Sequence, residues 1–191
     1  KDLIKPEFKG KVQVANPNSS GTSYTMLATL VQMMGEKEAF DYLRALHKNI
    51  NQYTKSGSAP IKAAGAGETV IGIVFVHDAV AVAEAGFPIK SVVPCEGTGY
   101  EIGSMSIVKG ARNLDNARKF YEFALSADFQ SKAKDVKSFQ VPSNKASSVS
   151  AKAPDLAKIK LIDYDFVKYG SSAERRRLLK KWDEEIGALP N

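Results

Sequence analysis

One segment restricts the possible folds more than any other part of the sequence: residues 11–25, KVQVANPNSSGTSYT. In it an apolar run ends at Asn16-Pro17, and a Ser/Gly/Thr loop follows at the expected start of a helix. Residues 12–15 predict a short strand, and the apolar spacing over 22–34 predicts a helix that Gly35 ends. A strand that leads directly into a helix is the repeating unit of α/β folds. The first N–H groups of such a helix have no partner within it, so they attract an anion.

The same design recurs at residues 55–60, KSGSAP. Residues 50–53 predict the preceding strand, Ser58 is the expected N-cap, and Pro60 fits the first turn of a helix that runs to about Ala66. Two Ser/Gly helix starts in one α/β unit indicate a cleft lined by helix N-termini, although each alone also fits an ordinary N-cap. No GxxxxGK[ST] loop occurs and residues 65–67 lack the setting of a dinucleotide loop, so nucleotide hydrolysis is not supported.

The rest of the chain continues the alternation of strands and helices. A second helix is expected over 36–48, and the apolar run VIGIVFV at 70–76 predicts a strand covered on both faces of a parallel sheet. A short helix over 79–85 and a strand over 89–93 follow, which together predict a doubly wound α/β domain.

The composition changes at 94–103 to Pro, Gly, Thr and acidic residues, so a lobe boundary is expected near 93–101. Beyond this boundary we expect a strand over 102–108, helices over 114–125, 127–133 and 172–186, and surface loop over 138–153.

Composition and charge restrict the function classes. The chain has 191 residues, 43% of them hydrophobic, and a net charge of +6. The basic run 175–181 is interrupted by Leu178 and Leu179, so it is interpreted as the solvated face of an amphipathic helix, and nucleic-acid binding is not predicted. A lone Cys95 excludes an intrachain disulfide, two histidines exclude a Cys/His zinc site, and no run of eighteen apolar residues occurs. No signal peptide precedes Lys1, as expected of a mature protein or a fragment.

Candidate ligand-binding residues follow the strands. Ligands of open α/β sheets lie beyond the carboxyl ends of the strands, where both serine loops and His77-Asp78 are expected. Asp78 can accept hydroxyl hydrogen bonds, His77 can donate or accept, and either Glu96 or Glu101 could face the same cleft. An anion cradle beside carboxylates suits a polyol that carries a phosphate. Alternatively, His77-Asp78 only caps the following helix.

Two other chemistries remain open on the residues alone. His, Asp and Glu with nearby serines could form a general base and a nucleophile, but no GxSxG or HExxH motif fixes such a set. His77, Asp78 and Glu101 could hold a metal, although only tyrosinate or further carboxylates would make a good ferric site. We therefore predict no cofactor and no metal site.

The order of motifs resembles periplasmic solute-binding proteins of bacterial ABC importers, in the branch often labelled ferric-iron-binding, which has hexose-phosphate-binding members. The motifs are KDLIKPEFKGKV, ANPNSSGTSYTMLATL, GIVFVHDA, PCEGTGYEIGSMSIVKGARN and a final amphipathic helix with Trp182. This resemblance implies a type II clamshell of two α/β lobes joined by crossing strands near 93–101. Residues 10–92 would form one nearly complete lobe, and residues 1–9 and 93–191 the C-terminal half of the other.

The same resemblance implies a non-catalytic protein that captures a small anionic ligand and docks on an ABC permease. It would be periplasmic, or lipid-anchored and extracellular in a Gram-positive source. The ligand set would comprise Ser19, Ser20, Gly21 and Thr22 as the anion cradle, and His77, Asp78 and Glu101 as the hydroxyl-binding set, with Ser58 and Glu96 as the candidates taken from the residues above.

The resemblance favours a hexose phosphate as the ligand. The ferric branch carries a tyrosine pair where His77-Asp78 stands, and neutral imidazole does not supply the anionic oxygen that Fe³⁺ prefers. The alternatives are Fe³⁺ or a phosphonate as ligand, an enzyme acting on sugar phosphates, or the effector domain of a transcription regulator, which would need a DNA-binding segment upstream.

Family members are longer, and the resemblance implies that the part missing here is N-terminal. Without it, the half lobe would expose apolar surface. A second fragment or oligomer contacts are therefore expected to cover that surface.

Overall fold

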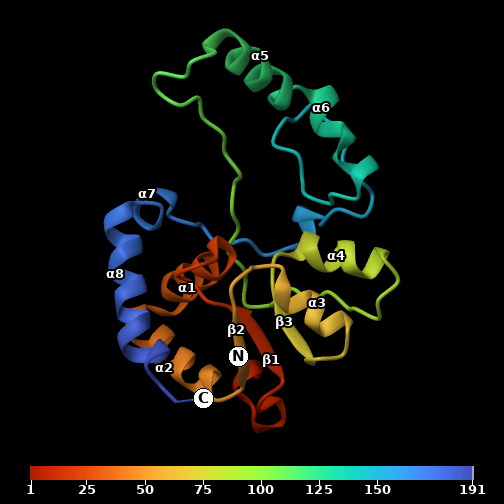
Figure 1. Ribbon diagram of the computed structural model, residues 1–191. Helices are drawn as coiled ribbons and strands as arrows, with labels where there is room; N and C mark the ends of the chain where they lie inside the picture. The colour runs from red at the N-terminus through yellow and green to blue at the C-terminus, as the bar shows by residue number, and fades with distance from the viewer. Residues whose placement is uncertain (191) are drawn as a thin grey trace. The chain divides into compact units, whose positions relative to one another are not determined.

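The computed structural model describes residues 1–190, which contain a three-stranded parallel sheet (Figure 1). Its strands are β1 (Val12–Ala15), β2 (Ile50–Thr54) and β3 (Ile71–Ile73), in the order β2-β1-β3. The central strand pairs in parallel with both neighbours, Val12 lying opposite Ile50 on one side and Ile71 on the other. Successive parallel strands need crossover connections, and helices supply them.

The α-helices are α1 (Gly21–Met34), α2 (Glu36–His47), α3 (Ala59–Gly65), α4 (Val76–Glu84), α5 (Leu114–Leu125), α6 (Ala127–Ser131), α7 (Phe166–Tyr169) and α8 (Ser172–Trp182). Short 3₁₀ helices span Asp2–Ile4, Pro6–Phe8, Lys132–Val136 and Leu156–Lys158, and a π-helical turn, Asp183–Gly187, continues α8. None of the helices within residues 1–190 is both long and apolar enough to cross a membrane.

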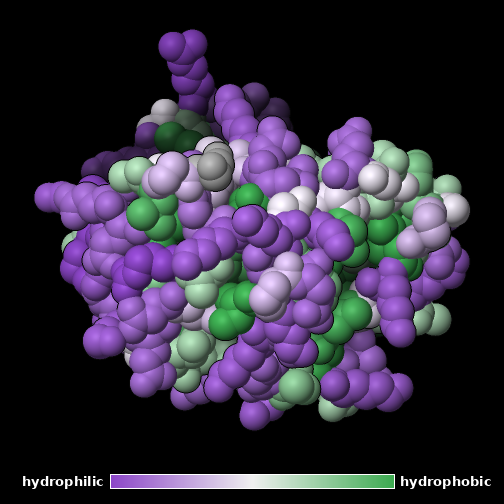
Figure 2. Space-filling model, turned by 90° about the horizontal axis from the view of Figure 1, so that it is seen from below, coloured by the Kyte–Doolittle hydropathy of each residue, from purple (hydrophilic) through white to green (hydrophobic). Residues whose placement is uncertain are grey.

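The chain divides into two compact units. Unit 1 consists of Lys1–Tyr100 together with the segment from Leu156 on, and unit 2 is Glu101–Asp155. In unit 1, one sheet face packs against α1 and α2, and α8 lies alongside these helices (Figure 1). Leu27, Leu178 and Ile186 are completely buried there, so α8 and the π-helical turn after it contribute to the same core as α1. The face of the protein seen in Figure 2 is mostly hydrophilic, with hydrophobic side chains in small separate groups.

Unit 2 contains α5, α6, a 3₁₀ helix and loops, and it has almost no core of its own. Phe139 is its one buried side chain. Large apolar side chains are exposed instead, among them Phe120 and Phe123 of α5, and Phe123 contacts Phe129 of α6 at a ring distance of 4.6 Å. An isolated unit with so little buried apolar surface cannot offset the entropy of ordering its chain.

The α/β class is confirmed, and three predicted strands are corrected. Residues 70–76 form a strand only at Ile71–Ile73, because β1 offers a partner only there, and Val76 already begins α4. Neither 89–93 nor 102–108 is a strand. Their apolar residues favour extended backbone, but no neighbouring strand pairs with them, and Val92 and Ile102 are exposed.

The division into units differs in two respects from the predicted lobes. The chain passes between units at Tyr100 and Glu101, inside the expected boundary of 93–101, and residues 1–9 belong to unit 1. The segment from Leu156 on also belongs to unit 1, because Leu178 and Trp182 pack in its core. The composition of the two lobes of a complete clamshell stays a prediction.

Candidate ligand-binding site

Three helices begin at the same edge of the sheet. The strands are parallel, so the ends of β1, β2 and β3 share one edge, and each is followed by a helix: α1, α3 and α4. This is the edge at which open α/β sheets bind ligands.

The two serine loops lie against each other at this edge. The Ser19 hydroxyl donates a hydrogen bond of 2.9 Å to the carbonyl oxygen of Lys55. A Cβ atom on Gly57 would lie only 2.8 Å from the Ser20 Oγ and closer still to the Thr22 Oγ1. The second loop therefore rests directly on the first turn of α1, and only glycine permits this approach.

The first turn of α1 keeps donors open for an anion. Ser20 is its N-cap, with the Oγ accepting from the Ser23 N–H at 3.4 Å, so the ordinary capping role is real. The N–H groups of Gly21 and Thr22 have no hydrogen-bond partner among the described residues. These two donors and the positive end of a 14-residue helix can hold a phosphate or carboxylate.

Ser58 stands at the N-cap of α3, as predicted, but its side chain makes no capping bond. Its Oγ lies 3.3 Å from the Oγ of Ser56, a residue that sequence reasoning did not single out. The hydroxyls of both residues belong to the loop that carries Gly57, so they extend the polar lining of this edge.

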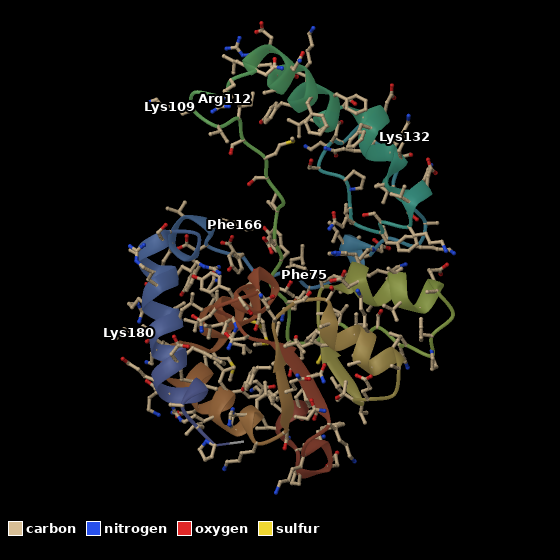
Figure 3. All side chains as sticks on the ribbon, in the orientation of Figure 1. Phe75, Lys109, Arg112, Lys132, Phe166 and Lys180 are labelled. Carbon is tan, nitrogen blue, oxygen red and sulfur yellow. The ribbon has the colours of Figure 1, made fainter. Side chains whose placement is uncertain are left out.

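His77 and Asp78 lie in the first turn of α4, which follows β3. The His77 ring stacks on Phe75, labelled in Figure 3, with 5.7 Å between ring centres, and its Nε2 lies 3.6 Å from the Asp78 Oδ1. Both side chains are about one quarter exposed, at 25% and 27%. Since β3 neighbours β1, this pair shares the sheet edge with the serine loops. Asp78 also lies near the positive end of α4, which fits the alternative role as a helix-terminal acid.

The structure does not bring Glu96 to this edge. The adjacent Gly97 lies beside Met33, in the last turn of α1 and thus at the end opposite the cradle. Glu101 opens unit 2, where its side chain is exposed, and its role as a ligand contact stays a prediction.

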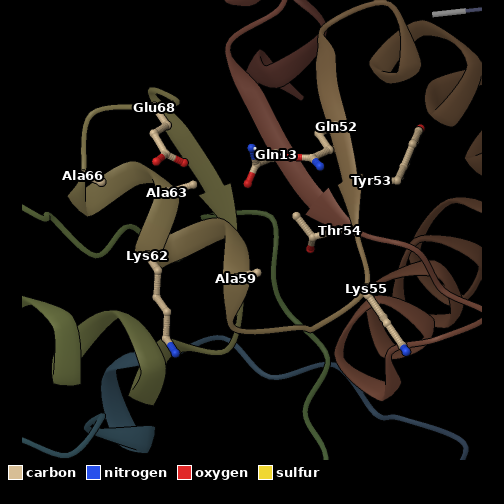
Figure 4. A pocket seen from close by; sticks show the side chains of 10 residues that line it. All are labelled: Gln13, Gln52, Tyr53, Thr54, Lys55, Ala59, Lys62, Ala63, Ala66 and Glu68. Atoms are coloured by element: carbon tan, nitrogen blue, oxygen red, sulfur yellow. Dashed lines mark hydrogen bonds between the residues drawn. The ribbon is translucent and has the colours of Figure 1, made fainter.

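Two lysines near the serine loops were missed by sequence reasoning. Lys55 opens the second loop and Lys62 lies on α3, and both border an open depression of about 530 Å³ beside β2. Figure 4 shows both side chains extending toward the end of the sheet at which β1 and β2 end. Neither lysine forms an ion pair within the described residues. The sequence feature that could have identified Lys55 as a candidate is its position immediately before Ser56-Gly57.

Residues 1–190 contain no group of three or more His, Cys, Asp or Glu side chains placed to hold a metal ion. The basic face of α8 is solvated, with Lys180 directed outward (Figure 3), whereas Arg177 and Lys181 pair with Glu36.

Comparisons with known proteins agree on one family. The profile of the family described as bacterial extracellular solute-binding protein matches residues 1–169. An uncharacterized protein of Haemophilus influenzae is 51% identical over 187 residues, which cover 97% of this chain and 54% of that protein. The chain thus spans about half the length of this curated relative.

Solved structures are similar to almost the whole of this chain. The periplasmic binding protein AfuA from Actinobacillus pleuropneumoniae, with fructose-6-phosphate bound, has 54% identity and a TM-score of 0.95, covering 98% of this chain and 59% of that one. The periplasmic binding protein P5PA has 42% identity and a TM-score of 0.91, and the match covers 97% of this chain and 59% of that one. A ferric binding protein from Campylobacter jejuni, at 23% identity and a TM-score of 0.78 over 96% of this chain and 60% of that one, shares the fold.

Proposed function

We propose that this chain, which belongs to the bacterial extracellular solute-binding protein family, is the ligand-capturing component of an ABC importer and binds a hexose phosphate. The observation that carries the proposal is the contact between the two serine loops, where Gly57 rests on the first turn of α1 beside the open N–H groups of Gly21 and Thr22. The relative with fructose-6-phosphate bound supports the choice of ligand.

In this proposal the phosphate binds at the N-terminus of α1 and the sugar hydroxyls bind to His77 and Asp78. The helix end supplies two N–H donors and a favourable dipole, and the Asp78 carboxylate accepts from hydroxyls with charge-assisted hydrogen bonds. Glu101 would add a second carboxylate. Binding would favour the closed arrangement of the lobes, which is a shift between conformations.

The protein is proposed to be non-catalytic and periplasmic. The Ser19 hydroxyl donates to the backbone oxygens of Asn16 and Lys55, and within residues 1–190 no histidine forms a hydrogen bond with it. The names of AfuA and P5PA both describe periplasmic binding proteins, and delivery to a membrane permease would follow capture. Neither a cofactor nor a nucleic acid has a role in this proposal.

Unit 2 is proposed to be covered by further polypeptide of the same protein. Its exposed apolar side chains and its one buried residue, Phe139, call for a covering surface. Because this chain spans 54% of one relative and 59% of two solved chains, the remaining part of such a protein is the proposed occupant. Intact mass with light scattering tests this for the 191-residue chain. Association or loss of structure in unit 2 is expected, and a well-folded monomer would contradict it.

Isothermal titration of the complete protein, meaning this chain with that additional polypeptide, tests the ligand. Glucose 6-phosphate and fructose 6-phosphate are expected to bind stoichiometrically and unchanged, with free glucose and inorganic phosphate binding more weakly. A coloured ferric complex without sugar-phosphate binding, or release of a product, would refute the proposal.

An Asp78→Ala variant tests the hydroxyl-binding residue. Charge-assisted hydrogen bonds contribute about 1.5–3 kcal/mol, so affinity for glucose 6-phosphate should fall about tenfold or more. Asp115→Ala is the matched control, because Asp115 also lies in the first turn of a helix, α5, but in unit 2. An unchanged dissociation constant for Asp78→Ala would remove Asp78 from the site.

A further inference from the structure

Helix α4 begins on an aromatic residue that cannot cap it. Its N-cap is Phe75, whose side chain accepts no bond from the first turn. Within residues 1–190, several helices instead start on a serine or aspartate whose oxygen accepts such a bond: α1 at Ser20, α6 at Ser126, α7 at Asp165 and α8 at Ser171. An apolar N-cap ordinarily costs helix stability, so the phenylalanine at this position indicates a role other than starting the helix.

The Phe75 ring provides a contact surface for His77. The two rings lie 5.7 Å apart, centre to centre, and their planes are 25° from parallel. Side chains two positions apart do not face each other within a helix, but the extended backbone of Phe75 lies outside the helical turn that carries His77. The N-cap position therefore allows a stacked ring pair, an arrangement that aromatic side chains favour.

The backbone of α4 is held in place by residues further along the helix. Ala79 is buried, and a Cβ atom on Gly65 of α3 would lie 3.1 Å from the Val82 Cγ1, so α4 packs closely on α3. The His77 side chain, in contrast, is 25% exposed and lies at the free end of the helix. The stacked Phe75 ring thus restricts the side-chain rotation of His77, whereas the packing on α3 fixes only the helix.

We propose that Phe75 is a positioning residue, which stacks on the His77 imidazole and holds it in the orientation that contacts the hydroxyls of the ligand. This rests on the proposed function, because it takes His77 as a ligand contact. A side chain that is ordered before binding loses less conformational freedom when the ligand arrives, so the complex is tighter. Phe75 acts through His77, so its effect on affinity requires the imidazole.

The test is a double-mutant cycle in the complete protein. Phe75→Leu keeps an apolar side chain but removes the ring, and Phe75→Tyr keeps the ring. His77→Ala and the double variant complete the cycle, which isolates the interaction between the two residues. Phe87→Leu is the matched control, because Phe87 follows α4, is 48% exposed and stacks on no other ring within residues 1–190.

Isothermal titration with glucose 6-phosphate measures the affinity, and the imidazole proton resonances of His77, assigned by their loss in His77→Ala, report the ring pair. Phe75→Leu is expected to weaken binding about three- to tenfold, as the loss of one aromatic pair implies, and to shift those resonances. Phe75→Tyr and Phe87→Leu should retain the affinity of the parent protein. In the His77→Ala background, Phe75→Leu should change the affinity less than about twofold.

Equal losses from Phe75→Leu with and without His77 would overturn the inference, because Phe75 would then act independently of the imidazole. An unchanged affinity in folded Phe75→Leu, or a loss of the same size in Phe75→Tyr or Phe87→Leu, would also overturn it. A parent protein that binds no sugar phosphate would overturn the proposed function together with the inference. In a parent protein that does bind, the other outcomes overturn the inference alone.

Discussion

Replacing Glu36 by Gln should weaken the attachment of α8 to α2 in a manner that depends on pH. The Glu36 carboxylate accepts two bonds from the Arg177 guanidinium, of 3.0 and 2.6 Å, and one of 2.8 Å from the Lys181 ammonium. The Arg177 bonds, followed by the Lys181 bond, hold the pKa of Glu36 at about 2, against an ordinary value of 4.5.

The size of the effect follows from that pKa. A difference of this size corresponds to at most about 3 kcal/mol. The Glu36 side chain is 31% exposed, so solvent screening reduces the contribution to about 1–2 kcal/mol. Because the folded-state pKa is lowered, this stabilisation is complete above the unfolded-state pKa and is lost as the pH falls from about 4.5 toward 2.

Urea unfolding followed by Trp182 fluorescence measures the effect. Trp182 is the single tryptophan, is buried in the core of unit 1 and ends α8, so it reports the element concerned. Glu36→Gln should lower the free energy of unfolding by about 1–2 kcal/mol at pH 7 and by less than half of that at pH 3.

Glu38→Gln serves as the control for this experiment. Glu38 lies in the same first turn of α2, is exposed, and forms no ion pair among the described residues. Equal losses for Glu36→Gln at pH 7 and pH 3, or a loss no larger than that of Glu38→Gln, would refute the reasoning.

Three further substitutions test the site and the core. In Gly57→Ala the new methyl group would overlap Thr22, so the free energy of unfolding should fall by about 1–3 kcal/mol. Glucose 6-phosphate should then bind about tenfold more weakly by titration calorimetry, and an unchanged affinity would show that the second serine loop does not shape the anion site. Tyr24→Phe should cost about 0.5–1.5 kcal/mol in urea unfolding, since it removes the hydroxyl bond to Tyr169. Leu178→Ala should cost about 2–5 kcal/mol, and a loss below about 1 kcal/mol would contradict the packing of α8 in the core.

The helices could be predicted from sequence because their apolar spacing is local information. The expected helix over 22–34 is α1, the one over 36–48 is α2, and those over 114–125 and 172–186 are α5 and α8 with its π-helical turn. The apolar pattern at 89–93 and 102–108 wrongly predicted strands, because a strand forms only beside a pairing strand and a local pattern does not show whether one is present. Within residues 1–190, β2 and β3 are the segments that pair with β1, and Thr98 and Leu161 form an isolated bridge.

The candidate site could be predicted only as far as its position in the chain. The serine loops follow β1 and β2 as expected, and strand order then places them at one edge. The close approach of Gly57 to Thr22 depends on how the loops pack, which no periodicity reveals. Glu96 lies away from the cradle for a similar reason, since the path of residues 97–100 along α1 is set by Gly99 and Thr29.

The late entry of α8 into the core of unit 1 has a consequence for biosynthesis. Tyr24 and its partner Tyr169 are 145 positions apart, and the whole of unit 2 is translated between them. At about 5–20 residues per second, a ribosome needs roughly 7–30 s to pass from one to the other. During that interval the part of α1 that Tyr169 and α8 cover in the folded unit is exposed, so the core of unit 1 cannot close until residues 169–186 have been made.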